Sequence, residues 1–336
     1  MARMSTQPSP ILIFDTLQAH QRTSSLRAGI ELKVFSAIAA GARTPEALAA
    51  ICGASAKGLR VLCDFLAIIG FLTKDESGYA LTPDSALFLV ESSPAYLGVM
   101  VGFLFNPFVE KGLASVTEAV RKGGTILPEE GTVSDDNQVW VDFAKGMANL
   151  TRPSAALIAE LTAGSGPLKV LDIAAGHGMF GITIAQENPA AEIYALDWKN
   201  VLTVAHDNAV KCGVADRWNA IDGSAFTADY GSDYDLVLVT NFIHHFDTPT
   251  NIGFFERARA AMKPGAKMAI LEMAVNDDRV TPPGPAMFAL TMLTTTAAGD
   301  AFSRNEIAAM CTAAGFPEVT HHTVPATSHT VTIAVS

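Results

Sequence analysis

The chain has 336 residues, of which 49% are hydrophobic, and its formal net charge is −11 because 34 acidic side chains outnumber 23 basic ones. This composition is typical of folded globular proteins and excludes a disordered chain. The acidic balance argues against a broad basic surface for nucleic-acid phosphates or anionic lipid. We therefore expect no nucleic-acid and no membrane partner, and the length suits two domains.

The cysteines Cys52, Cys63, Cys212 and Cys311 are scattered and form no CxxC pair. We therefore expect reduced thiols rather than a zinc site. The longest apolar stretch, 95–105, is too short to span a bilayer, and the N-terminus lacks the pattern of a secretory signal. These features predict a cytoplasmic protein without a bound metal.

The beginning of the chain is predicted to be helical. Apolar residues recur every four positions from Leu26 to Ile38, which predicts one helix ending near Gly41. Two further helices are expected at 45–52 and 55–69, followed by a short hairpin. Short helices followed by a hairpin are typical of a winged helix.

The charge of this winged helix bears on its role. Residues 41–90 carry four basic and five acidic side chains, whereas a DNA-reading segment should offer several cations to phosphates. A scaffolding or dimerising role is therefore favoured over DNA binding. Further helices are expected up to residue 160, and the small residues of 162–167 then form a candidate linker. We place the domains at 1–160 and 161–336.

The second half alternates short apolar strands with helices. Strands are expected at 170–173, 192–196, 218–221, 235–240 and 268–271, with a closing hairpin at 319–324 and 330–335. This alternation predicts a parallel sheet covered by helices on both faces. Ligands of such sheets bind at the carboxyl ends of the strands.

A glycine-rich turn stands at the first of these strand ends. Gly176–Gly181 matches GxGxxG between a predicted strand and a predicted helix, and Asp197 ends the next strand. Both NAD and S-adenosylmethionine fit this pattern. Asp172 lies four residues before the first glycine, where it would repel a pyrophosphate but favour a ligand with an ammonium and a sulfonium group. S-adenosylmethionine is therefore favoured over NAD, and a dehydrogenase is a weaker alternative.

Five segments resemble the motif series of class I S-adenosylmethionine-dependent methyltransferases: VLDIAAGHGMFG, the acid in YALDW, GSAF at 223–226, NFIHHFD at 241–247 and MKPGAKMAILE at 262–272. The winged-helix half, FAKGM at 143–147 and NEIAAMCTAAGF at 305–316 resemble the plant and bacterial small-molecule O-methyltransferases, which include the caffeic-acid and acetylserotonin enzymes. The likeness implies an α/β fold: a Rossmann-like, mostly parallel sheet with an antiparallel C-terminal strand. It also implies an N-terminal all-helical winged-helix dimerisation domain, and a homodimer formed through it.

The resemblance also implies where the cofactor binds. By similarity, the loop up to Gly178 cradles the methionine part of S-adenosylmethionine, Asp197 binds the ribose, and residues 223–226 line the adenine pocket. Ser224 stands where the family usually has an acid, and Thr240 where plant enzymes often have Lys. The expected cofactor-binding residues are Asp172, Ala174, Gly176, Gly178, Asp197, Trp198, Gly223, Ser224, Ala225, Phe226 and Thr240.

Catalysis is expected at the end of the fourth strand. By similarity, His244 is the general base, because a hydroxyl is a poor nucleophile until a group such as His removes its proton. His245, a second candidate, replaces the Asp of the plant enzymes, and Glu272 matches the acid that steers the base. A second family acid would fall near Ala301, which cannot serve, with Asp300 beside it. Alternatively, the two histidines only cap the strand.

Met and Phe side chains supply the candidate acceptor pocket and indicate an apolar, aromatic acceptor. The expected pocket residues are Phe103, Phe105, Phe108, Trp140, Phe143, Met147, Met287, Phe288 and Met292. The sequence thus predicts methyl transfer from S-adenosylmethionine to a hydroxyl group of a small acceptor, without a metal. The alternatives are a carbon, sulfur or nitrogen acceptor, where proximity rather than a base drives transfer, and a ligand-sensing winged-helix regulator.

Overall fold

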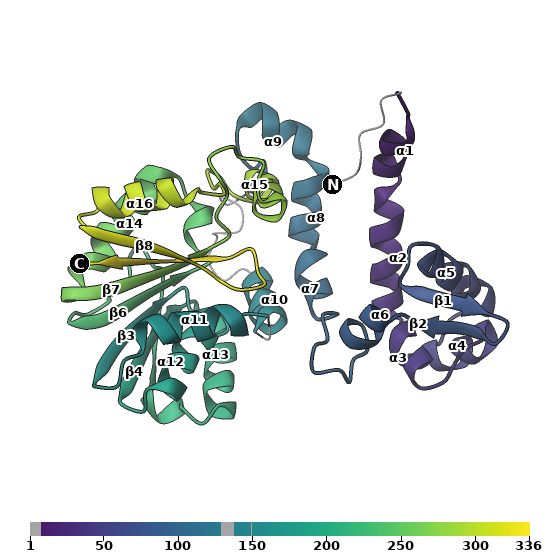
Figure 1. The fold of residues 1–336 in the computed structure, drawn as a ribbon, viewed down its shortest axis with the longest axis horizontal. Coiled ribbons are helices and arrows are strands. Elements are labelled where there is room, and N and C mark those ends of the chain that lie inside the picture. Colours follow the sequence, from purple (N-terminus) through teal and green to yellow (C-terminus); the bar gives the residue numbers. More distant parts are fainter. Residues whose placement is uncertain (1–7, 129–137, 149) are drawn as a thin grey trace. The chain divides into compact units, whose positions relative to one another are not determined.

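The computed structural model describes residues 8–128, 138–148 and 150–336. The chain divides into two compact units, Met1–Val101 and Gly102–Ser336 (Figure 1). The domain boundary expected at 160/161 falls inside the second unit. The reason is that the helices before and at this boundary pack on later elements. Helix α10 (Gln138–Met147) packs on α13 (Lys199–Lys211), and α11 (Arg152–Thr162) packs on α12 (Met179–Glu187).

The first unit is a small helical domain with a two-stranded antiparallel hairpin. Its elements are α1 (Ile11–Leu17), α2 (Ala19–Glu31), α3 (Val34–Ala39), α4 (Pro45–Cys52), α5 (Ala56–Ile68), β1 (Leu72–Asp75), β2 (Gly78–Leu81) and α6 (Pro83–Phe88). The side chains of Thr44 and Ser55 cap the predicted helices α4 and α5 by accepting backbone N–H groups of their first turns. Helix, helix and hairpin therefore follow in the predicted winged-helix order.

The continuous helix expected from Leu26 to Ile38 is wrong, because the chain breaks at Lys33. Lys33 adopts a left-handed conformation with φ of 56° between α2 and α3. The break lets Val34 and Phe35 become fully buried in the core of the unit. A four-residue apolar repeat fits both arrangements, so the pattern alone could not locate this turn.

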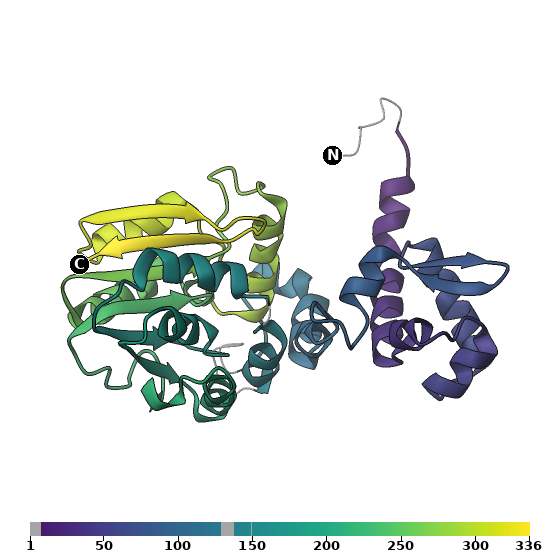
Figure 2. The ribbon, with the colours of Figure 1, turned by 60° about the horizontal axis from the view of Figure 1, so that its bottom comes forward.

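The second unit is built on a seven-stranded sheet with the order β5-β4-β3-β6-β7-β9-β8. The first five strands in this order are parallel, and β9 pairs antiparallel with both β7 and β8. The C-terminal hairpin formed by β8 and β9 lies at one edge of the sheet (Figure 2). The strands are β3 (Leu168–Ile173), β4 (Ala191–Asp197), β5 (Trp218–Asp222), β6 (Tyr234–Thr240), β7 (Met262–Glu272), β8 (Glu318–Thr323) and β9 (Thr330–Val335). Strand β7 starts six residues earlier than expected from the sequence, which placed Met268 at its start.

Helices cover both faces of this sheet. One core contains α11, α12 and α13, and the other contains α14 (Thr248–Ala260) and α16 (Arg304–Ala313), with alternate strand residues facing each side. The helices are α7 (Met100–Leu104), α8 (Pro107–Ala114), α9 (Val116–Lys122), α10 (Gln138–Met147), α11 (Arg152–Thr162), α12 (Met179–Glu187), α13 (Lys199–Lys211), α14 (Thr248–Ala260), α15 (Pro283–Thr295), α16 (Arg304–Ala313) and the 3₁₀ turns η1 (Ala215–Arg217) and η2 (Ile243–His245).

Neighbouring strands β3 and β6 continue in opposite directions across this sheet, since β3 leads to β4 and β6 leads to β7. The loops that follow them therefore separate and leave a crevice at their carboxyl ends. The predicted mostly parallel α/β sheet is confirmed, and it places the candidate site at this edge.

Candidate active site

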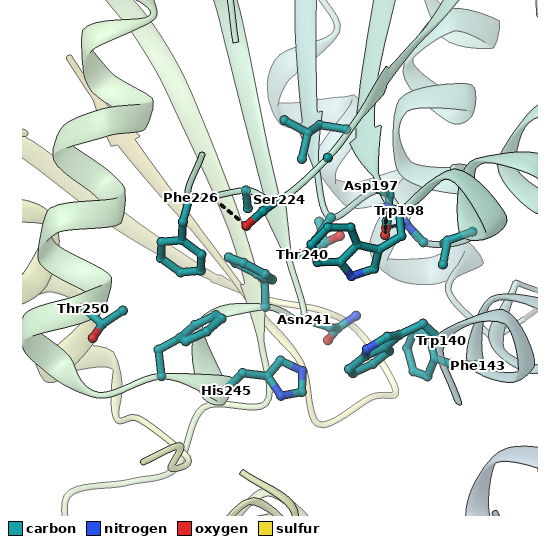
Figure 3. A pocket seen from close by; sticks show the side chains of 18 of the residues that line it. Trp140, Phe143, Asp197, Trp198, Ser224, Phe226, Thr240, Asn241, His245 and Thr250 are labelled. Atoms are coloured by element: carbon teal, nitrogen blue, oxygen red, sulfur yellow. Dashed lines mark hydrogen bonds between the residues drawn. The ribbon is translucent and has the colours of Figure 1, made fainter. Parts of the chain in front are cut away.

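A cavity of about 540 Å³ lies at the carboxyl ends of β3, β4, β5 and β6. Figure 3 shows Trp140 and Phe143 at one end, Phe226 and Thr250 at the other, and His245 between them. Nine of the residues expected to bind the cofactor line this cavity: Ala174, Gly176, Asp197, Trp198, Gly223, Ser224, Ala225, Phe226 and Thr240. Their side chains come from four separate strand ends, so the fold brings them together.

The glycine-rich turn forms one wall of the cavity through its backbone. Ala174, Gly176 and Gly178 all have positive φ, of 53°, 57° and 73°. Gly178 itself does not line the cavity, and a Cβ there would come within 3.0 Å of the Cβ of Ala205 on α13. The turn thus bends sharply and stays close to α13, which leaves its backbone open toward the cavity.

Asp197 connects the ends of β3 and β4. Its Oδ2 accepts the backbone N–H of Gly176 at 2.8 Å, and its Oδ1 accepts that of Trp198 at 2.7 Å. Burial raises the pKa of this carboxyl group to about 6, although both hydrogen bonds oppose the rise. Each oxygen keeps further acceptor capacity, so Asp197 can also bind two neighbouring hydroxyl groups.

Asp172 does not line the cavity, contrary to the expectation of direct contact with the cofactor. It is fully buried beneath the turn, where Oδ2 accepts the backbone N–H of Gly181 at 3.2 Å and Oδ1 has no hydrogen-bond partner. Burial raises its pKa to about 8, and the nearby Asp197 adds to the rise. At neutral pH this group is therefore mostly uncharged, and it holds α12 against β3.

The end of the cavity near Thr250 is aromatic. The rings of Phe226 and Phe246 are 4.8 Å apart edge to face, and Phe242 lies 5.0 Å from Phe246. Asn241, Phe242, Phe246, Asp247 and Thr250 all line the cavity but were not assigned a role from the sequence. Four of them belong to the segment NFIHHFD at the end of β6, next to the two predicted histidines. The same sequence motif could therefore have identified them as cavity residues.

His244 and Glu272 form a buried pair at the ends of β6 and β7. The Nδ1 atom of His244 lies 2.7 Å from Oε2 of Glu272, and Oε1 accepts the backbone N–H groups of Phe242 and Ile243. The carboxylate is thus fixed by backbone donors and can orient the imidazole. The ring of Phe288 stands edge-on against His244 at 4.9 Å.

His245 lines the cavity, whereas His244 is not among the lining residues. The two rings are 4.3 Å apart, and the edge of Trp140 packs against His245 at 5.1 Å. Burial and the neighbouring His244 lower the pKa of His245 well below its ordinary value. His245 is therefore neutral at physiological pH.

Asp300 does not take the place of the second acid. Its backbone N–H donates to the carbonyl oxygen of His244 at 3.0 Å, but its carboxylate pairs with Arg279 at 3.6 Å. Ala301 is buried. A different titratable group, His329, lies in the β8–β9 connection within electrostatic reach of Glu272 and His244, and burial lowers its pKa. No sequence motif pointed to His329, because it lies far along the chain from His244 and Glu272.

The expected acceptor residues separate into three groups. Trp140 and Phe143 line the cavity, and Phe103 packs edge-on against Phe143 at 5.1 Å. Phe288 and the buried Met292 lie on α15, on the side of His244. Met287, on the same helix, is 69% exposed and does not line the cavity. Three further residues are half-buried and do not line the cavity either: Phe105, Phe108 and Met147.

Comparison with known proteins places this geometry in a family. Residues 129–317 match the model of the O-methyltransferase domain, and residues 14–91 match that of the O-methyltransferase dimerisation domain. The chain belongs to the O-methyltransferase family. It is an α/β enzyme of this class with a dimerisation domain ahead of its catalytic sheet, and the dehydrogenase alternative is therefore set aside.

Three similar proteins span nearly the whole O-methyltransferase. The structure of a candidate O-methyltransferase from Nostoc punctiforme is 46% identical, with a TM-score of 0.95 over 98% of this chain and 100% of that one. The 3-hydroxy-5-methyl-1-naphthoate 3-O-methyltransferase of Streptomyces sahachiroi is 25% identical over 84% of this chain and 83% of its own. Human N-acetylserotonin methyltransferase, solved with S-adenosylmethionine, has a TM-score of 0.85 over 99% of both chains at 20% identity.

The part of the chain that the structure describes contains no helix long and apolar enough to cross a membrane.

Proposed function

We propose that this O-methyltransferase transfers the methyl group of S-adenosylmethionine to a hydroxyl group of a small, apolar, aromatic acceptor, with His244 as the general base. The observation that carries the proposal is the His244–Glu272 pair at the same sheet edge as the glycine-rich turn and Asp197. The relative from Streptomyces sahachiroi methylates a hydroxylated naphthalene ring by its name, which supports an aromatic hydroxyl acceptor here.

The cavity fits S-adenosylmethionine in size and in chemistry. Its volume of about 540 Å³ lies within the usual range of small-molecule sites. The backbone of the turn around Gly176 would hold the methionine part, Asp197 the ribose hydroxyls, and the rings of Phe226 and Phe246 the adenine face. Ser224, at the position of the family acid, already accepts the backbone N–H of Phe226, so we expect adenine to be held mainly by its faces.

S-adenosylmethionine supplies an electrophilic methyl group on a positively charged sulfur. Glu272 accepts the Nδ1–H of His244, which leaves Nε2 with a lone pair for the proton of the acceptor hydroxyl. The fixed carboxylate then stabilises the imidazolium. Such a base contributes about 10²–10⁴ in rate, whereas correct orientation of the reactants can supply about 7–11 kcal/mol. The aromatic wall of Trp140 and Phe143 is suited to this orientation.

Donor binding is tested by calorimetry with S-adenosylmethionine and S-adenosylhomocysteine. We expect binding to the unaltered protein and a loss of at least about tenfold in Asp197→Asn, since a charge-assisted hydrogen bond contributes about 1.5–3 kcal/mol. Asp222→Asn is the matched control, because Asp222 pairs with Asp197 in the sheet register and is exposed. No binding at millimolar ligand would refute the proposal.

The acceptor and the base are tested by turnover. Hydroxylated naphthalenes and phenols are incubated with the donor, and products that gain one methyl group are identified by mass spectrometry. His244→Ala should lower kcat by about 10²–10⁴ without changing donor affinity, and His206→Ala, an exposed histidine on α13, is the control. Intact turnover in His244→Ala would instead favour a carbon, sulfur or nitrogen acceptor.

We also propose that the enzyme is a homodimer formed through the matched dimerisation segment, residues 14–91. Five large apolar side chains of α1, within Ile11–Leu17, are 57–76% exposed. Four of them are consecutive, so they point to all sides of the helix, and a helix that is apolar all round is typical of an element buried in an interface. Light scattering should give about twice the chain mass of 35.4 kDa, and the mass of one chain would exclude the dimer.

A further inference from the structure

His177 occupies the middle of the glycine-rich turn, and neither the sequence pattern nor the mechanism above gives it a role. Its side chain is only 2% exposed. Its Nδ1 atom accepts a hydrogen bond from the backbone N–H of Met179, the first residue of α12, at 3.1 Å. Its backbone carbonyl oxygen accepts a hydrogen bond from the side-chain amide of Asn208 at 2.9 Å. Burial lowers the pKa of the ring to about 4, so it is neutral at pH 7 and carries its proton on Nε2.

The same ring packs against the helix at the acceptor end of the cavity. It lies nearly parallel to Phe143 of α10, with ring centres 6.5 Å apart and planes inclined by 16°, and 5.4 Å from Phe180. Phe143 in turn meets the ring of Trp140 at 5.9 Å, and Trp140 meets His245 at 5.1 Å. A continuous series of aromatic contacts therefore runs from the turn to the cavity wall.

We propose that His177 is a positioning residue that couples the glycine-rich turn to α10, so that a ligand held by the turn also fixes Phe143 and Trp140 in the wall that faces the acceptor. The inference rests on the proposed function, because it requires that the turn binds the methyl donor or its product. His177 combines two separable contacts: a hydrogen bond that shapes the turn, and a stacked ring that reaches α10.

Two substitutions separate these contacts. In His177→Asn, an amide oxygen near the position of Nδ1 can still accept the N–H of Met179, as Asn does in turns, but the stacked ring is lost. In His177→Phe the ring remains and the acceptor is lost. His206→Asn, on the exposed surface of α13, is the matched control. Circular dichroism and the melting temperature check that each variant is folded.

The measurements use S-adenosylhomocysteine as the probe. Calorimetry gives its affinity, and hydrogen exchange followed by mass spectrometry gives the slowing of amide exchange in α10, Gln138–Met147, at saturating ligand. In the unaltered protein we expect the ligand to slow exchange in α10. His177→Asn should bind within about twofold of the unaltered protein, while this slowing falls by about two- to twelvefold, the factor typical of an aromatic pair.

His177→Phe should show the opposite result. Its affinity should fall by about two- to twelvefold, the factor typical of one hydrogen bond, while the slowing in α10 at saturation is retained. The inference is overturned if the ligand slows amide exchange in α10 of His177→Asn as much as in the unaltered protein. It is also overturned if both variants lose affinity and slowing to the same extent, because that result indicates a purely structural role. If the unaltered protein does not bind S-adenosylhomocysteine, the proposed function itself fails and this inference with it.

Discussion

Replacing Asp172 by Asn should make the second unit more stable relative to the unaltered protein as the pH rises. Asp172 is fully buried, with one oxygen hydrogen-bonded to Gly181 and the other without a partner. Burial raises its pKa from 3.8 to about 8. The unfolded chain therefore loses its proton first, and the stability that Asp172 contributes is complete only below pH 3.8 and is lost as the pH rises through about 8.

The size of this effect follows from the linkage between protonation and folding. Each pH unit between the two pKa values costs about 1.4 kcal/mol of unfolding free energy. From pH 5 to pH 8 the unaltered protein should thus lose about 3–4 kcal/mol that Asp172→Asn does not lose. The amide of the variant also leaves an unpaired donor, which costs about 1–3 kcal/mol, but this cost is independent of pH and cancels from the slope.

Urea unfolding followed by tryptophan fluorescence measures this slope. The protein has three tryptophans, Trp140, Trp198 and Trp218, and all lie in the second unit, so the signal reports the unit that contains Asp172. Asp222→Asn, at the same sheet edge but exposed, is the control for a charge change. A constant free-energy difference between Asp172→Asn and the unaltered protein from pH 5 to 8 would mean that the buried carboxyl is ionised in the folded state, and the reasoning would be wrong.

Three further changes test the catalytic end of the site. Glu272→Gln should lower kcat by about 10²–10³ without changing donor affinity. The amide of Gln would donate to Nδ1 of His244 and move the ring proton to Nε2, which could then no longer accept the proton of the acceptor hydroxyl. An unchanged kcat in steady-state kinetics would disprove this role. Gly299→Ala should lower both kcat and the melting temperature, because its methyl group would collide with the carbonyl oxygen of His244; a variant as active and as stable as the unaltered enzyme would contradict the packing. Ser303→Ala removes the side-chain hydrogen bond of a capping box on α16, in which the Ser303 hydroxyl accepts the backbone N–H of Glu306, and should cost about 1 kcal/mol in urea unfolding while leaving ligand affinity unchanged.

Most of the second unit follows directly from local sequence patterns. The buried strands β3 and β6 are short apolar runs bounded by turn residues. The carboxyl ends of these parallel strands were located to within about two residues, and the candidate cofactor residues stand at those ends. Because parallel strands finish at one edge of the sheet, correct strand ends were sufficient to bring Asp197, Ser224 and Thr240 together.

Burial is the property that the sequence could not supply. Asp172 and Asp197 are both acids at strand ends, yet one lies under the turn and the other faces the cavity. The difference depends on the alternation of β3, whose last residues point to opposite faces of the sheet, and on the turn that covers Asp172, where Gly181 donates its backbone N–H to the buried carboxyl group. The family comparison supports S-adenosylmethionine over NAD, as the charge argument concluded. The premise of that argument was nevertheless wrong, because Asp172 is buried and mostly uncharged at neutral pH.

The acceptor wall shows the same difficulty with side-chain direction. Met287 and Phe288 are adjacent on α15, but only Phe288 packs on His244, while Met287 is exposed. Consecutive helical residues point about 100° apart, so composition alone cannot tell which of two apolar neighbours enters a site. His177 illustrates the converse case, since a polar residue within a recognised motif provides an aromatic contact to α10 that no local pattern could reveal. We therefore expect acceptor selectivity to depend on contacts between segments remote in the chain, and we expect the relative turnover of different acceptors to change more in Phe288→Ala than in Met287→Ala.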